Sequence, residues 1–213
     1  MIPKLHYISQ GSSPKQHLVN IQNACNSGIE LVQLDITQRS EKEILKIAQE
    51  AREITSHFQT RLIINNHYKL AKDVKADGVY LDKTGSCPTI ARKHLYTWQL
   101  ISGVANTLQD CETLLTKEVD YIHLEPFRAT TTKDQAFPVL GLNGYTTIIE
   151  TLQTKTPIIG FGGITTEDVT AILETGISGI AVSEEITRDF NTIRTFHQLL
   201  KASSTEEQRH TFK

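Results

Sequence analysis

Short runs of apolar and β-branched residues alternate with longer segments of helical spacing along most of this chain. Eight such runs occur, at residues 4–9, 31–36, 61–65, 78–81, 99–103, 121–124, 157–160 and 179–182. This alternation is typical of βαβ units built around a parallel sheet. Because each strand-like run precedes a helix-like segment throughout, the pattern predicts an α/β fold that closes into a single (β/α)8 TIM barrel.

The clearest helical segment is SEKEILKIAQEAREI, residues 40–54. Ser40 is the expected N-cap, Glu43 occupies its capping-box position, and Ile44, Ile47 and Ala51 line one face. The main alternative to a barrel is an open doubly wound sheet, which often carries a dinucleotide fingerprint after its first strand. The first turn here reads SQGSSP and lacks that glycine spacing, so the barrel is favoured.

Length and composition add limits to this picture. A chain of 213 residues fits one barrel, which we expect over residues 1–202, with a polar C-terminal tail over residues 203–213. The net charge of −2, with cations scattered among acids, provides no basic stripe for nucleic acid and no polybasic membrane anchor. No stretch approaches the roughly 18 apolar residues of a membrane span. We therefore expect no nucleic-acid partner and no membrane partner.

Cysteine and histidine usage excludes some kinds of site. Cys25, Cys87 and Cys111 are an odd, widely spaced set without a Cys-x-x-Cys pair, which suggests neither a zinc knuckle nor a disulfide framework. The start of the chain lacks the features of a signal peptide, and we expect a cytoplasmic location. No histidines are paired at metal-ligand spacing. His67 and His123 lie near strand ends, where a surface or inter-strand role is favoured over a role in the site.

Two aromatic residues, Tyr96 and Trp98, come just before the fifth predicted strand. In a barrel this is the end at which residues contribute to stability and not to chemistry. We interpret both as packing residues.

Functional groups of such barrels follow the carboxyl ends of the strands. The segment RATTTK, residues 128–133, offers three hydroxyls, backbone N–H groups and an ammonium, as an oxyanion site requires, although a solvated loop would read the same way. The segment GFGGIT, residues 160–165, favours the anion site because glycines let backbone amides approach a ligand. Strands six to eight are the usual corner for phosphate in this fold.

The segments IPKLHYISQG, VQL, LIINN, KADGVYL, ANTLQDC, VDYIHLEPFRATTTK, PVLGLNGY, TPIIGFGGIT and SGIAVS carry a resemblance. In order and spacing the chain resembles the thiamine-phosphate synthases and their TenI relatives over nearly its whole length. The most specific part is the threonine-rich loop ending in TK, followed by a GL-x-G helix start and the GGI turn. The resemblance implies a role in thiamine biosynthesis. Synthases of this family join hydroxymethylpyrimidine diphosphate to thiazole phosphate, releasing diphosphate, with Mg²⁺ as cofactor.

The resemblance also assigns residues to substrates. It implies thiazole-phosphate contacts at Thr130, Thr131, Thr132, Gly163, Ser183 and Glu184. It implies pyrimidine-diphosphate contacts at Gln33, Asn65 and Lys133, of which Lys133 is the candidate catalytic residue.

Departures from the family pattern gather in the half of the site that binds diphosphate and metal. Where the family has Gln-x-Arg-x-Lys, this chain has Gln33 followed by Asp35 and Thr37 in place of the two cations. The family's two magnesium carboxylates are replaced by Asn66 and Gly85, so we expect no metal at those positions.

Smaller departures lie on the neighbouring strands. Val104 stands where a substrate-binding hydroxyl is usual, and Glu125 replaces a glycine. Asn106 stands where TenI-type tautomerases have a histidine. An alternative is a rebuilt site, in which Arg39 supplies a diphosphate cation and Asp35 or Asp82 a metal ligand.

These substitutions lead to a functional hypothesis. We expect a thiamine-phosphate synthase family protein with a divergent magnesium-diphosphate site, a small-molecule phosphate ligand, and weak or no synthase activity. The alternative is a non-catalytic or regulatory TenI-like protein that binds thiazole phosphate or thiamine phosphate. Unrelated phosphate-sugar chemistry on the same scaffold is a third hypothesis. A homo-oligomer is possible because family members are often oligomeric.

Overall fold

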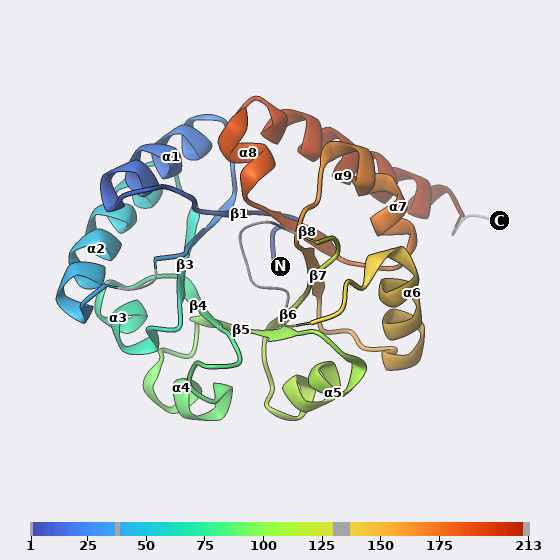
Figure 1. The fold of residues 1–213 in the computed structure, drawn as a ribbon, viewed down its shortest axis with the longest axis horizontal. Coiled ribbons are helices and arrows are strands. Elements are labelled where there is room, and N and C mark those ends of the chain that lie inside the picture. Colours follow the sequence, from blue (N-terminus) through green and yellow to red (C-terminus); the bar gives the residue numbers. More distant parts are fainter. Residues whose placement is uncertain (1, 37–38, 130–136, 211–213) are drawn as a thin grey trace.

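Eight parallel strands close into one barrel in a computed structural model that describes residues 2–36, 39–129 and 137–210, with side chains to residue 202. Each strand pairs with its sequence neighbours, and β1 pairs with β8 to close the barrel. Figure 1 looks down the barrel and shows the strands inside a ring of helices. The strands are β1 Leu5–Ile8, β2 Leu31–Leu34, β3 Arg61–Asn65, β4 Gly78–Leu81, β5 Leu100–Ala105, β6 Tyr121–Leu124, β7 Ile158–Phe161 and β8 Gly179–Val182.

The helices follow the strands in alternation. They are α1 Pro14–Asn26, α2 Glu41–His57, α3 Tyr68–Asp73, α4 Pro88–His94, α5 Leu108–Thr116, α6 Gly141–Leu152, the short 3-10 helix η1 Thr166–Asp168, α7 Val169–Glu174, α8 Glu184–Arg188 and α9 Thr192–His210. Helix α9 continues into the segment predicted as a polar tail, and the division at residue 202 stays a prediction. The predicted TIM barrel is confirmed.

The strand bounds agree closely with the hydrophobic runs. Strands β3, β4, β6 and β8 have the predicted bounds, and the other four differ by one or two residues at one or both ends. Strand β5 extends to Ala105 because Val104 and Ala105 pair with His123 and Leu124 of β6. The capping box of α2 is formed as predicted, with Ser40 Oγ accepting from the Glu43 amide and Glu43 accepting from the Ser40 amide.

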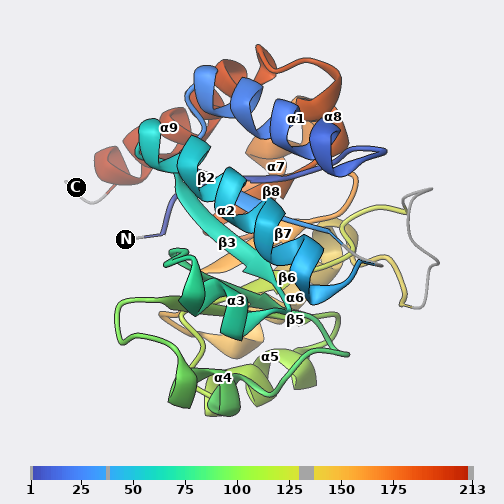
Figure 2. The ribbon, with the colours of Figure 1, turned by 90° about the vertical axis from the view of Figure 1, so that its left-hand side faces the viewer.

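Alternate side chains of each strand fill the barrel interior in layers drawn from every second strand. The strand pairing places Gln33, Tyr80, His123 and Ala181, from β2, β4, β6 and β8, in one such layer. Two residues further along the same strands come Asp35, Asp82, Glu125 and Ser183. This end of the barrel, where the strands finish, is called the mouth below. Figure 2 shows the barrel from the side, with the start of the chain at the opposite end.

Candidate functional site

Buried polar side chains mark the mouth of the barrel. Gln33 is 2% exposed, Asn65 9% and Asn106 3%, although all three carry amides that prefer water or a partner. Within the described residues, the side-chain carbonyl oxygens of all three have no hydrogen-bond partner. Because an unpaired buried polar group costs free energy, these atoms are candidates for contact with a ligand or bound water.

Asp35 is held in a fixed position at the end of β2. The Asn65 side-chain amide donates to Asp35 Oδ1 at 2.6 Å, and the Asp35 backbone amide donates to Ser9 Oγ at 3.1 Å. Ser9 Oγ also lies 3.0 Å from Nδ1 of His17. A carboxylate with this support cannot turn away from the mouth without losing a hydrogen bond to Asn65. Thr37, the second departure on this strand, lies outside the described residues.

Asn66 joins the ends of β3 and β4. Its Nδ2 donates to Asp82 Oδ2 at 2.7 Å, and its Oδ1 accepts from the Asp82 backbone amide at 2.9 Å. Gly85 packs against the same side chain, since a Cβ at Gly85 would lie 2.5 Å from Asn66 Oδ1. The two positions at which the resemblance implies magnesium ligands are therefore an amide that faces a carboxylate and a glycine at which a Cβ would crowd that amide.

Hydrogen bonds determine the charge state of Asp82. Burial by itself raises the pKa of this carboxyl, but hydrogen bonds from Asn66, from the hydroxyl and amide of Thr84 and from the Gly85 amide outweigh it, so the pKa is lowered. Asp82 is therefore a carboxylate at neutral pH. Its oxygens already accept hydrogen bonds from groups of the protein.

The pKa of Tyr80 reflects burial and the negative charge near the mouth. Its ring is 4% exposed, and the pKa of its phenol is raised well above the ordinary value by burial first and then by the charges of Glu125, Asp35 and Asp82. The charges of three acidic side chains that follow alternate strands thus act on one phenol. Within the described part of the chain, the nearby cation Lys83 is engaged elsewhere, in an ion pair with Asp110 at 2.8 Å.

The turn after β7 has the backbone that an anion site requires. Gly162 and Gly163 have φ angles of +106° and +68°, a region that favours glycine. Gly162 is buried, and a Cβ there would lie 3.1 Å from the Phe127 amide nitrogen, whereas Gly163 is exposed. Adjacent positive-φ glycines allow backbone amides to face a ligand. This supports the prediction at Gly163 without testing it.

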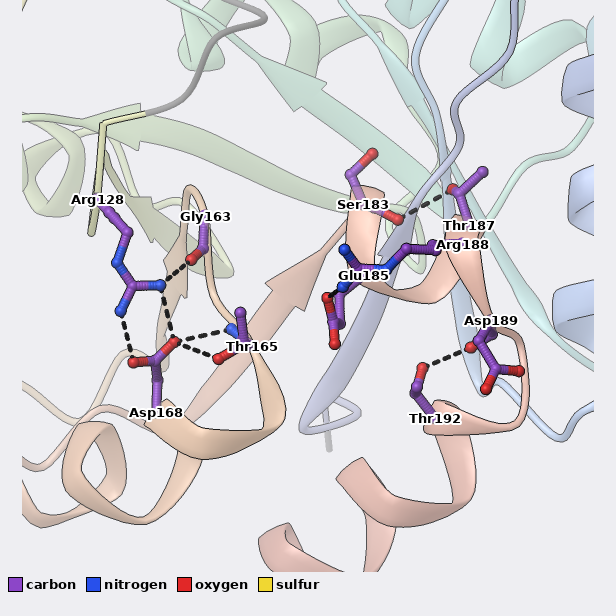
Figure 3. Close-up of polar contacts among 10 residues, drawn as sticks. All are labelled: Arg128, Gly163, Thr165, Asp168, Ser183, Glu185, Thr187, Arg188, Asp189 and Thr192. Atoms are coloured by element: carbon purple, nitrogen blue, oxygen red, sulfur yellow. Dashed lines mark hydrogen bonds and ion pairs between the residues drawn. The ribbon is translucent and has the colours of Figure 1, made fainter.

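Arg128 fixes this turn to the loop after β6. Its guanidinium donates to the carbonyl oxygen of Gly163 at 2.6 Å and forms two contacts with Asp168, at 2.7 and 3.1 Å (Figure 3). Asp168 in turn accepts from the amide and hydroxyl of Thr165. Sequence reasoning missed both Arg128 and Asp168, although the Thr165-x-x-Asp168 spacing is a capping-box signal for the start of a helix.

The base of the threonine loop is closed by backbone hydrogen bonds. The Leu140 amide donates to the Pro126 carbonyl at 2.9 Å, and the Gly141 amide donates to the Phe127 carbonyl at 3.0 Å. Helix α6 begins at Gly141, in agreement with the GL-x-G signal. The predicted residues Thr130, Thr131, Thr132 and Lys133 lie outside the described residues, so their roles stay predictions.

Ser183 and Glu184 follow β8 at the same corner. Ser183 Oγ donates to the Ile8 carbonyl at 3.0 Å, which ties the turn to β1, and the Ser183 carbonyl accepts from Thr187 at 2.9 Å (Figure 3). Glu184 is exposed, so its carboxylate can remain in solvent and need not face a phosphate.

The two histidines near strand ends differ in position. His123 is fully buried inside the barrel, with its ring 5.0 Å from Tyr80 and 5.6 Å from His6, which confirms an inter-strand position. His67 is half-buried at the N-cap of α3.

The interpretation of Tyr96 and Trp98 as packing residues needs correction. Their rings stack at 5.7 Å, but Tyr96 is 41% and Trp98 53% exposed. They pack on each other, at the end of the barrel away from the mouth, and not into the core. An aromatic pair before a strand gives no sequence signal that distinguishes these two arrangements.

Neither a metal cluster nor a membrane-spanning helix occurs in the described part of the chain. Within the described ranges, no three His, Cys, Asp or Glu side chains are grouped so as to hold a metal ion. None of the helices in those ranges is long and apolar enough to cross a membrane.

The fold and the mouth define a (β/α)8 barrel with a glycine turn suited to phosphate after β7 and acidic side chains after β2, β4 and β6. A family model described as thiamine monophosphate synthase matches residues 5–186. The chain belongs to this family, which confirms the resemblance in its sequence and supports the family's function.

Individual relatives agree with this assignment. The thiamine-phosphate synthase of Flavobacterium johnsoniae is 37% identical over 190 residues, covering 88% of this chain and 90% of the relative. That of Flavobacterium psychrophilum is 37% identical over 204 residues, covering 94% and 99%. Among solved structures, thiamine phosphate pyrophosphorylase from Pyrococcus furiosus has a TM-score of 0.78 and 23% identity, covering 92% of this chain and 96% of the other. The last likeness shows the fold.

Proposed function

We propose that this protein acts in thiamine biosynthesis as a family member that binds the phosphate ligand of the family reaction but has weak or no synthase activity. Relatives of this chain are named thiamine-phosphate synthase, which supports the family activity, and the residues of the site limit it. The observation that carries the limit is Asp35, a carboxylate fixed by Asn65 at a position where the family resemblance implies an arginine.

Asp35 has the wrong sign of charge for the family reaction. A departing diphosphate needs positive charge, and removing one preorganised stabilising group costs roughly 10²–10³ in rate. Asp35 removes such a group and adds repulsion. The family's magnesium would supply the remaining positive charge and hold the diphosphate, but the residues present do not fit it, since Asn66 turns an amide toward Asp82 and Gly85 carries no ligand.

The phosphate corner supports the binding half of the proposal. The glycine turn at Gly163 is fixed by Arg128, and Glu184 is exposed, so its carboxylate can stay in solvent. Together with the predicted contacts at Thr130 to Thr132, Ser183 and Lys133, this corner would accept one phosphate. Thiazole phosphate or thiamine phosphate should therefore bind more tightly than hydroxymethylpyrimidine diphosphate. The diphosphate ligand would retain only the predicted contacts at Gln33, Asn65 and Lys133.

A coupled synthase assay with both substrates, with and without Mg²⁺, tests the proposal. We expect little turnover in either condition, together with measurable binding of thiazole phosphate by calorimetry. Turnover at an ordinary synthase rate with strong magnesium dependence would contradict the limit, and would show that the metal is held by other residues. Binding without turnover would leave the non-catalytic or regulatory TenI-like role as the remaining function.

A further inference from the structure

Two consecutive glycines give the turn after β7 more conformational freedom than other residues would. Gly162 and Gly163 have φ angles of +106° and +68°, and glycine can also reach many other backbone conformations at little cost. A turn that presents its amides to an anion binds more tightly when those amides are already held in one direction, because the ligand then does not have to order them. Another group is therefore needed to hold the two glycine peptides.

Arg128 contacts both of these peptides. Its backbone amide donates to the Gly162 carbonyl at 2.9 Å, and its guanidinium donates to the Gly163 carbonyl at 2.6 Å. A trans peptide is planar, and its N–H points away from its carbonyl. Fixing the two carbonyls therefore turns the amides of Gly163 and Ile164 away from Arg128. An anion held by these amides would lie on the other side of the turn from the guanidinium.

Asp168 holds the guanidinium in place. Its carboxylate accepts from Arg128 Nη2 at 2.7 Å and Nη1 at 3.1 Å, and it also accepts from the amide and hydroxyl of Thr165 at 2.8 and 2.9 Å (Figure 3). Burial raises the pKa of the Asp168 carboxyl, but the hydrogen bonds from Arg128 and Thr165 outweigh it, so the pKa is lowered and the pair is charged at neutral pH.

This ion pair is suited to orienting the turn more than to stabilising the fold. The Arg128 side chain is 49% exposed, and pairs with such an exposed member contribute little to folding stability. The charges of the two side chains cancel, so the pair adds little net attraction for an anion. What the pair does determine is the direction of the Gly163 carbonyl, and through it the direction of the Ile164 amide.

We propose that Arg128 and Asp168 are positioning residues for the phosphate corner. Together they hold the peptides of the glycine turn so that its amides face a phosphate that neither side chain touches. This inference rests on the proposed function, which supplies the phosphate ligand.

Two substitutions distinguish positioning from direct attraction of charge. Asp168→Asn removes a negative charge, and Arg128→Lys keeps the positive charge. Direct attraction would therefore tighten phosphate binding in the first variant and preserve it in the second. Positioning predicts the opposite, because asparagine has one acceptor oxygen in place of two and lysine lacks the planar fork of arginine. By calorimetry, each variant should bind thiazole phosphate about tenfold more weakly than wild type.

Two further measurements test whether the pair acts as a unit and through the turn. R128K/D168N should lose no more affinity than the weaker of the two single variants, since residues that act together are not additive. In NMR spectra of wild type, thiazole phosphate should shift the amide signals of Gly163 and Ile164, and these shifts should shrink in D168N. A change in stability alone would not reduce them in the folded protein.

A matched pair at the other end of the barrel provides the control. Arg92 donates to the Gln99 carbonyl at 2.7 Å and to Asp120 at 2.6 Å, and Asp120 accepts from the Ile101 amide at 2.7 Å. This pair has the same kinds of contact but lies before β5 and β6, away from the mouth. Arg92→Lys and Asp120→Asn should therefore leave the affinity for thiazole phosphate unchanged. Thermal melting of every variant establishes that a lost affinity does not reflect unfolding.

The outcomes separate this inference from the function on which it rests. Unchanged or tighter binding of thiazole phosphate by folded D168N would overturn the positioning role and leave the phosphate-binding function standing. Additive losses in R128K/D168N, or equal losses in the control pair, would also overturn it. Failure of the wild-type protein to bind thiazole phosphate would overturn the proposed function, and the inference with it.

Discussion

Asn66 determines whether the mouth has an amide or a second carboxylate beside Asp82. In Asn66→Asp, an acceptor would replace the donor that lies 2.7 Å from Asp82 Oδ2. We expect the free energy of unfolding to fall by about 1–3 kcal/mol without metal, because two carboxylates would meet and a hydrogen bond would be lost. Mg²⁺ should recover this loss, since a carboxylate pair binds a divalent cation. The measurement is the urea unfolding midpoint with and without Mg²⁺.

Asn66→Ala is the matched control for this experiment. It removes both the donor to Asp82 Oδ2 and the acceptor of the Asp82 amide without adding a charge, so it should be destabilised but insensitive to Mg²⁺. A stabilisation by Mg²⁺ of the same size in wild type, N66A and N66D would show that the metal acts somewhere else.

His6 makes stability depend on pH. Burial, with a smaller contribution from Arg61, lowers the pKa of this fully buried histidine from 6.5 to about 4 in the folded chain, despite a hydrogen bond to the Pro3 carbonyl. Between these values the unfolded chain binds a proton that the folded chain does not, so the free energy of unfolding decreases as pH falls. By pH 5 the loss should be about 2 kcal/mol relative to pH 7.

Urea unfolding of His6→Gln at pH 7 and pH 5 isolates this contribution. Glutamine has no proton to gain, so the difference between the two pH values should shrink by about 2 kcal/mol relative to wild type. His57→Gln, at an exposed position on α2, serves as the control and should keep the wild-type difference. An unchanged difference in H6Q would place the pH dependence in other groups.

At the scale of single residues, the sequence predicts replacements within the motifs but not the contacts that these residues make. The places of Asp35, Asn66 and Gly85 in the motifs predict that they replace family cations and carboxylates, and this stays a prediction. Their partners could not be predicted, because the contact of Asn66 with Asp82 joins residues on different strands that no short pattern connects. The link between Arg128 and Asp168, across 40 residues, was missed for the same reason.

At the scale of elements, Tyr145 of α6 holds β6 and β7 together beneath the phosphate corner. Its hydroxyl donates to the Leu124 carbonyl at 2.8 Å and accepts from the Phe161 amide at 3.1 Å, and its ring fills the space beside Gly160. Tyr145→Phe should lower the free energy of unfolding by about 1–3 kcal/mol, because both backbone groups lose their buried partner. Denaturant unfolding measures the loss.

Tyr96→Phe is the control, because its exposed ring should keep the stacking on Trp98 without the hydroxyl. A loss in Y96F equal to that in Y145F would mean that the hydroxyl of Tyr145 contributes nothing specific to the joint between the strands.

The elements themselves could largely be predicted. Strands such as Arg61–Asn65 and Tyr121–Leu124 matched the hydrophobic runs because a parallel strand buried on both faces is apolar at nearly every position. The ends that differed, such as that of β5 at Ala105, depend on pairing with the next strand, which is a property of the closed barrel. The direction of Tyr96 and Trp98 could not be predicted, because neither local pattern nor spacing distinguishes a core ring from an exposed pair.

At the scale of the whole molecule, the arrangement of charge around the mouth should decide turnover. We predict that wild-type protein has little or no synthase activity, and that restoring family charges together raises it more than restoring any one of them. The full set is Asp35→Arg, Thr37→Lys, Asn66→Asp and Gly85→Asp. The reason is cooperation within one charge cluster, since cations without magnesium cannot neutralise a leaving diphosphate and one carboxylate holds magnesium poorly.

The structure indicates that Gly85→Asp differs from the other three substitutions. A side chain at Gly85 would meet Asn66 Oδ1 at 2.5 Å, and Asp82 already places a carboxylate beside Asn66. The triple variant D35R/T37K/N66D should therefore match or exceed the quadruple variant in kcat, and Gly85→Asp alone should lower the melting temperature without adding activity. The measurement is the coupled assay across a magnesium titration, with each variant first checked by thermal melting. If the quadruple variant is clearly the more active and the triple remains silent, then Asp82 cannot serve as the second ligand, and the loop at Gly85 must adjust to accept one.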